Sequence, residues 1–237
     1  MKHIKLIFTV LTVIAIYIIY AFASPDDISY LALGDSFALG ENPYGEVAYG
    51  YSDYLSNYLA QNHHLKLYTK KFASVDARIK DIQQDILLNR KVYIDGKSIG
   101  LKSGLRDTDI ITLSVGANDL LSQISVLSEV MIEKKQDEII DKIGADLTSL
   151  LKEIEKYNKN IVLVGYYNLY PKNEVYRVLF KKLDEKYREV SQDKKIIYIS
   201  LYDDFPYDKY LPNPFNIHPS IEGYEYIYQK IVQNIEY

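Results

Sequence analysis

The sequence predicts an α/β fold in which five parallel strands form a central sheet covered by helices on both sides. Two observations predict this fold. Short β-rich runs alternate with longer helical patterns from Ile28 onward. Three of these runs, ISYLAL, DIITLSV and NIVLVG, are largely apolar through their length, as strands buried on both faces must be. Strands separated by helices imply right-handed parallel crossovers, so a three-layer α/β/α sandwich is the expected architecture.

Each element is expected from its local pattern. The expected strands are the short β-rich runs Ile28–Leu33, Leu65–Phe72, Asp109–Val115, Asn160–Gly165 and Ile196–Ser200. The expected helices are the longer segments Tyr51–Gln61, Ala77–Leu88, Glu129–Tyr157, Glu174–Ser191 and Ile221–Ile235. An Asp95-Gly96 turn between alternating residues predicts a small hairpin over Val92–Ile99, inserted before the third strand. No repeat or linker divides the chain, so residues 26–237 are expected to form one domain.

The first 25 residues have the pattern of an export segment. Lys2 and Lys5 precede an uncharged apolar run, which ends in Ala-Phe-Ala and is followed by polar residues. A positive start, an apolar stretch and an A-x-A end are typical of a secretory signal peptide, and the run is also just long enough for a membrane anchor. Both interpretations remain open, and both place the rest of the chain outside the cytoplasmic membrane, either secreted or anchored to it.

The composition excludes several classes of function. The formal net charge of −4 argues against a nucleic-acid partner bound through phosphate neutralisation. Cysteine is absent, which excludes disulfides, thiolate metal sites and cysteine nucleophiles. Four histidines, one of them His3, make a multi-histidine zinc site a poor prediction. We therefore expect no metal and no cofactor, and we look for chemistry carried by side chains alone.

Three chemically useful residues fall in loops that the sheet would gather at one edge. Ser36 follows the first strand, Asn118 follows the third, and His218 lies just before the final helix. A serine hydroxyl becomes a nucleophile when a nearby base takes its proton, and histidine titrates near neutrality and can do so. An asparagine amide can donate a hydrogen bond to the oxyanion of a tetrahedral intermediate. Each motif alone could be a turn or a helix cap, but their joint occurrence is specific.

At these residues the sequence resembles the GDSL, or SGNH, hydrolases, in particular the secreted bacterial lipase/acylhydrolase branch. The resemblance runs from about Ile28 to Ile235 and rests on three blocks, Gly34-Asp35-Ser36 with Gly40, Gly116-Ala117-Asn118-Asp119, and His218-Pro219. It implies a flavodoxin-like sandwich and metal-free hydrolysis of esters and thioesters. It also implies Ser36 as the nucleophile, Asn118 as an oxyanion donor and His218 as the general base.

The sequence departs from the family pattern at two places. Asp76 stands where the family has an oxyanion-hole glycine, so its backbone N–H is the expected donor, beside a carboxylate that must point away. Phe215 stands three residues before the histidine, where the family has an aspartate. Asn216 is the expected third member of the catalytic group, and it can orient His218 but cannot stabilise an imidazolium as a carboxylate does. Asp203, Asp204 and Asp208 lie near enough in sequence to substitute.

The expected function is that of an extracytoplasmic serine esterase or lipase working through an acyl-enzyme. The expected substrates are small-molecule, lipid or lysophospholipid esters, or O-acetyl groups on surface glycans. The absence of a large lid-like apolar segment favours short acyl chains. Two alternatives remain: a binding or scaffold protein with weak or lost catalysis, suggested by the departures at Asp76 and residues 215–216, and a glycan-directed hydrolase using carboxylates. Oligomeric state and the alcohol part of the substrate are left open.

Overall fold

The protein contains a five-stranded parallel sheet, as the sequence predicts. The computed structural model describes residues 27–194 and 196–235, so the expected export segment lies outside the described residues. The strand order is β2-β1-β5-β6-β7. The strands are β1 (Asp27–Gly34), β2 (His64–Thr69), β5 (Ile110–Ser114), β6 (Ile161–Val164) and β7 (Ile197–Ile199). Every neighbouring pair in this sheet is parallel, so helices must cross over its faces.

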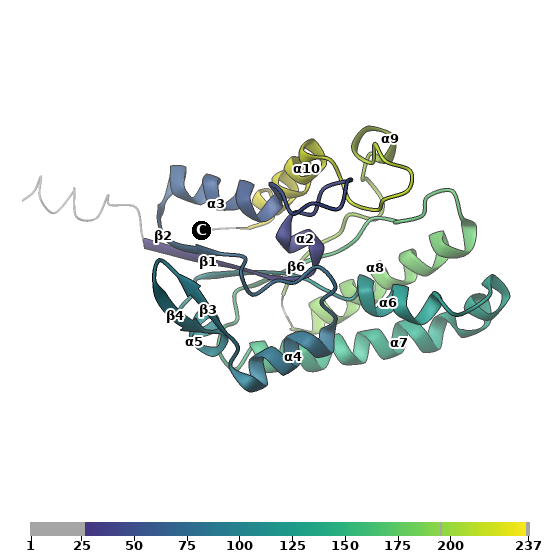
Figure 1. Ribbon diagram of the computed structural model, residues 1–237. Coiled ribbons are helices and arrows are strands. Elements are labelled where there is room, and N and C mark those ends of the chain that lie inside the picture. The colour runs from purple at the N-terminus through teal and green to yellow at the C-terminus, as the bar shows by residue number, and fades with distance from the viewer. Residues whose placement is uncertain (1–26, 195, 236–237) are drawn as a thin grey trace, which may run out of the picture.

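Helices cover both faces of the sheet and complete the three layers (Figure 1). One layer contains α3 (Tyr51–Asn62) and α10 (Ile221–Val232), which pack against each other. The opposite layer contains α4 (Ile79–Leu88), α7 (Glu129–Ile154) and α8 (Glu174–Lys194), with α7 packed between the other two. The sheet is therefore shielded from solvent on both sides, as its apolar strands require.

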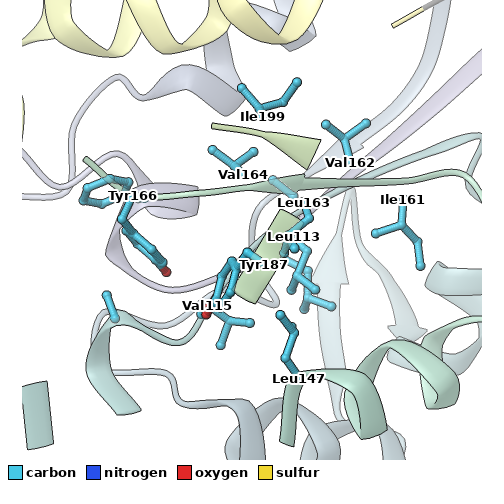
Figure 2. Close-up of a cluster of buried hydrophobic side chains, with 14 of the residues drawn as sticks. Leu113, Val115, Leu147, Ile161, Val162, Leu163, Val164, Tyr166, Tyr187 and Ile199 are labelled. Carbon is cyan, nitrogen blue, oxygen red and sulfur yellow. The ribbon is translucent and has the colours of Figure 1, made fainter. Parts of the chain in front are cut away.

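The core is centred on β1, β5 and β6, the three strands with the most continuous apolar runs. All residues of β5 and β6 are buried. Figure 2 shows Leu113 of β5 and Leu163 of β6 close together, with Tyr187 of α8 beside Val115. The Tyr187 hydroxyl donates a 2.6 Å hydrogen bond to the Val115 carbonyl, so this tyrosine fills the core and also satisfies a backbone acceptor at the end of β5.

The predicted hairpin forms from β3 (Lys91–Ile94) and β4 (Lys97–Gly100), which pair antiparallel. Its two turn residues, Asp95 and Gly96, both have positive φ, of 48° and 78°. This is the conformation that a two-residue hairpin turn of type I′ requires. The hairpin stands apart from the main sheet.

Four short helices were not expected from the sequence. They are α2 (Ser36–Leu39), α5 (Leu101–Arg106), α6 (Ala117–Ile124) and α9 (Tyr207–Tyr210). The second strand also ends earlier than expected, at Thr69, because Lys71 and Phe72 turn away from the sheet. Of the helices that the structure describes, none is long and apolar enough to cross a membrane.

Candidate active site

The turn after β1 presents a serine at the carboxyl edge of the sheet. Asp35 is the N-cap of α2, and its carboxylate accepts a 3.1 Å hydrogen bond from the Phe37 amide. Ser36 is therefore the first residue of this helix, where its own N–H has no acceptor within the helix. The turn closes at Gly40, whose φ of 80° is the left-handed conformation that favours glycine.

A buried network holds this turn against the neighbouring strands. The Asp35 carboxylate accepts hydrogen bonds from the Ser114 hydroxyl, at 2.8 Å, and from the Tyr166 hydroxyl. Burial raises the pKa of Asp35 to about 6, although these hydrogen bonds favour its charged form. Asp35 is thus a structural residue that fixes the position of Ser36.

His218 lies next to Ser36, although 182 residues separate them in sequence. Its Nε2 is 2.7 Å from the Ser36 Oγ. Its Nδ1 is 2.8 Å from the Asn216 Oδ1, which also accepts a 2.8 Å hydrogen bond from the His218 backbone N–H. An amide oxygen only accepts, so Nδ1 carries the proton and Nε2 is the free base facing Ser36. Burial lowers the pKa of His218 to about 4, which keeps this base neutral.

A residue that the sequence analysis did not select completes the surroundings of the imidazole. The Glu41 Oε1 is 3.7 Å from the His218 Nδ1, and the side chain of Glu41 is 11% exposed. Glu41 comes directly after the Gly40 turn, in a loop with no motif that distinguishes it from an ordinary surface loop. Its proximity to His218 depends on the way α2 folds back, and no sequence signal reports it.

Of the two expected oxyanion donors, Asn118 lies in the first turn of α6 and Asp76 lies in the neighbouring loop before α4. The Asn118 amide is 3.2 Å from the Val75 carbonyl and 3.1 Å from the Ala77 carbonyl, so it ties α6 to the loop that contains Asp76. Asp76 is exposed. Among the described residues, positive φ at non-glycine positions is confined to Asn89 and Asp95, so the backbone of Asp76, the residue expected at the family's glycine position, has no left-handed strain.

The other candidates for the third position are directed elsewhere. Phe215 is 96% exposed, so it does not stand in for the family aspartate. Asp204 forms an ion pair with Lys230, and Asp208 lines a neighbouring cavity. The side chains that contact the His218 ring nitrogens are instead those of Ser36, Asn216 and Glu41.

A cavity opens beside Asn216. Its volume is about 490 Å³, within the range of small-molecule sites. Its lining combines aromatic, aliphatic and proline side chains with a few polar groups, among them Tyr170, Tyr207, Leu211 and Asn213. Within residues 27–194 and 196–235, no three His, Asp or Glu side chains are grouped so that they could hold a metal ion.

Comparison with known proteins finds similar folds at low sequence identity. A lipase from a goat rumen metagenome is 19% identical, with a TM-score of 0.70 over 87% of this chain and 97% of that one. An acetylxylan esterase from Geobacillus stearothermophilus, solved as a catalytic mutant, is 15% identical, with a TM-score of 0.62 over 90% and 95% of the two chains. An extracellular lipase from Streptomyces rimosus is 14% identical, with a TM-score of 0.63 over 88% and 100%. These likenesses establish the fold.

The family is identified from the sequence rather than from the fold. No curated protein sequence matches the chain. The model of the GDSL-like lipase/acylhydrolase family matches residues 30–231, which include all three motif blocks and the sheet apart from the first three residues of β1. The resemblance expected from those blocks is therefore confirmed. The chain belongs to the GDSL-like lipase/acylhydrolase family, and it is a carboxylic ester hydrolase.

Proposed function

We propose that the protein is an extracytoplasmic serine esterase in which Ser36 is the nucleophile and His218 is the general base. The observation that carries this proposal is the 2.7 Å contact between the Ser36 Oγ and the His218 Nε2, with Asn216 holding the proton on the opposite ring nitrogen. This arrangement meets the geometric requirement for an activated serine, a base within hydrogen-bond reach that is itself oriented by a third group.

The reaction proceeds through an acyl-enzyme. The Ser36 hydroxyl proton moves to the His218 Nε2 while Oγ attacks the acyl carbon, giving a tetrahedral oxyanion and an imidazolium. His218 then returns the proton to the leaving alcohol as the ester C–O bond breaks. Water, deprotonated by His218 in the same way, then attacks the acyl carbon, and His218 returns that proton to the Ser36 Oγ as the bond between Oγ and the acyl carbon breaks and the acid is released.

The oxyanion is held by the Ser36 N–H, the Asn118 side chain and the N–H of Asp76. Ser36 supports this assignment because its amide is the first of α2 and has no acceptor within the helix. Asn118 supports it because its amide lies within 3.2 Å of both carbonyls that flank Asp76, which brings the two donors into one region. The Asn118 amide must turn one N–H from this loop toward the oxyanion for the donor role.

The proposed substrates are esters with a compact acyl or alcohol group, either O-acetylated glycans or lipid and lysophospholipid esters. The cavity beside Asn216 supports a small substrate, since its volume is about 490 Å³ and prolines and tyrosines form much of its wall. The similar structures include both lipases and an acetylxylan esterase, consistent with either class. The expected export segment places the enzyme outside the cytoplasmic membrane, where surface glycans and lipids are available.

An active-site-directed fluorophosphonate tests the mechanism without a known substrate. We expect one equivalent of label on Ser36 in the folded protein, located by mass spectrometry of the modified peptide. A series of p-nitrophenyl esters of increasing chain length then measures the acyl preference, with the highest kcat/KM expected for short chains. Folded protein whose Ser36 resists the probe would contradict the esterase mechanism and favour a binding protein on the same fold.

The pH dependence should show the low pKa of the buried histidine. His218 accepts the serine proton only when neutral, and burial lowers its pKa from 6.5 to about 4. We therefore expect kcat/KM to fall only as the pH drops through about 4, leaving the enzyme active at pH 5. Stopped assays between pH 3.5 and 8 measure this limb, and the exposed His64→Gln variant is the control. An acid limb centred at 6.5 would show that His218 is hydrated in solution.

A further inference from the structure

Glu41 is a buried carboxylate that the fold holds in place but does not neutralise. Its backbone N–H donates a 3.0 Å hydrogen bond to the Ser36 carbonyl, and its own carbonyl accepts a 2.7 Å hydrogen bond from the Tyr224 hydroxyl. The carboxylate oxygen Oε2 is buried and has no hydrogen-bond partner. A buried polar atom left without a partner is rare in native proteins and calls for an explanation.

The imidazole of His218, which lies beside Glu41, lacks a carboxylate bonded to its Nδ1. Proton transfer from Ser36 turns it into an imidazolium, whose charge a neighbouring carboxylate stabilises in serine hydrolases. Here Nδ1 donates its hydrogen bond to the Asn216 Oδ1, and that amide is neutral. Asn216 therefore fixes the tautomer and orientation of the ring but leaves its positive charge uncompensated.

We propose that Glu41 is the positioning residue that supplies this missing negative charge through His218, so that orientation and charge compensation are divided between Asn216 and Glu41. The Glu41 Oε1 is 3.7 Å from the His218 Nδ1, close enough for an ion pair once the ring is protonated. This inference rests on the proposed serine esterase function, and it names a residue that acts on the same site from the loop after α2.

The arrangement favours the transition state over the resting enzyme. In the resting state His218 is neutral, while burial and the nearby Asp76 carboxylate both raise the pKa of Glu41. The groups that face Glu41 are His218 from the loop before α10, Asp76 from the loop before α4, and the Tyr224 hydroxyl from α10. When the imidazolium forms, it offsets the unfavourable environment of the carboxylate. Only interactions that strengthen in the transition state raise kcat.

The first test is Glu41→Gln, which keeps the shape of the side chain and removes its charge. We expect kcat to fall about 10- to 100-fold with KM nearly unchanged, a smaller loss than the about 10⁴-fold seen when a directly bonded aspartate is replaced by asparagine. The acid limb of kcat/KM should move to lower pH, because the variant lacks the charge that favours protonated His218. Unchanged kcat and an unchanged acid limb would overturn the proposal.

Rescue distinguishes a role in charge compensation from a role in folding. Asn216→Asp places a carboxylate directly on Nδ1, and in the Glu41→Gln background it should restore kcat at least 10-fold. In the wild-type background, where Glu41 already supplies the charge, the gain should be smaller. The matched control is Glu46→Gln, an exposed glutamate of the same loop, with kcat expected to stay unchanged. A double variant no faster than Glu41→Gln alone would count against the proposal.

Two measurements separate this proposal from the proposed function. Failure of the fluorophosphonate to label Ser36 in the wild-type protein would remove the esterase mechanism. An NMR titration of His218, assigned by loss of its signal in His218→Gln, is independent of activity. A pKa of His218 lower in Glu41→Gln than in wild type supports the proposed electrostatic contact, and equal values in the two proteins overturn it.

Discussion

Replacing Ser36 with alanine is expected to lower kcat for ester hydrolysis by about 10⁴- to 10⁶-fold while leaving the fold intact. The variant has no oxygen to form the acyl-enzyme, and the remaining oxyanion donors and bound geometry support only a weak attack by water. Ser36 Oγ makes its hydrogen bond to His218, a contact within the site rather than within the core. Steady-state assays with a short-chain p-nitrophenyl ester measure the loss.

The matched control is Ser125→Ala, an exposed serine at the end of α6 whose hydroxyl donates a hydrogen bond to the Ser122 carbonyl of the same helix. Its kcat should equal that of the wild type. The double variant Ser36→Ala/His218→Ala should be no slower than Ser36→Ala alone, since residues that act as one unit are not additive. Hydrolysis that survives in Ser36→Ala would instead point to carboxylate chemistry.

Replacing Gly34 with alanine is expected to destabilise the protein by about 4 kcal/mol or more, among the largest effects of a single substitution. Gly34 ends β1 with a φ of 135°, and an added Cβ would lie 1.9 Å from the Ser114 carbonyl oxygen of β5. Backbone oxygen cannot move aside as a side chain can. The two central strands must therefore separate, and Asp35 and Ser36 would move with them.

The control for this variant is Gly96→Ala in the β3–β4 hairpin. Gly96 also has a positive φ, of 78°, but no atom lies within 4 Å of an added Cβ. Gly96→Ala should therefore lower the free energy of unfolding only by the cost of placing alanine at a positive φ, about 1–2 kcal/mol. Urea unfolding of both variants measures the difference, which isolates the steric contact between β1 and β5. Equal losses would show that the strands adjust to the methyl group.

The sheet was predictable because its central strands carry an unambiguous signal. A run such as IITLS in β5 is buried at every position, and only a strand covered on both faces has this composition. The short helices were not predictable, because four to eight residues are too few for a helical period to be seen. In α6, the Gly116–Asp119 motif predicts a site segment, but read alone it is compatible with either a turn or a helix cap, so it does not predict the helix that begins there.

Only those site residues that belong to short sequence motifs could be predicted. Ser36 and His218 could be selected because each lies in a short recognisable block at the end of an element, and the structure brings the two side chains together. Glu41 could not, since its position beside His218 depends on the Gly40 turn and on the Tyr224 contact, which are tertiary features. The role of Asp76 stays a prediction from the resemblance.

Asp35 and His218, the two buried titratable residues next to Ser36, have opposite effects on the pH dependence of the unfolding free energy. Asp35 keeps its proton up to about pH 6 in the folded chain but loses it near 3.8 when unfolded, so its effect on the unfolding free energy becomes less favourable as the pH rises. His218 resists protonation down to about pH 4 in the folded chain but is protonated near 6.5 when unfolded, so its effect becomes less favourable as the pH falls. Each amounts to about 3 kcal/mol, with opposite slopes between pH 4 and 6. Because the two effects oppose each other, the unfolding free energy changes little between pH 6 and pH 4. In the same pH range His218 stays neutral and can still accept the Ser36 proton.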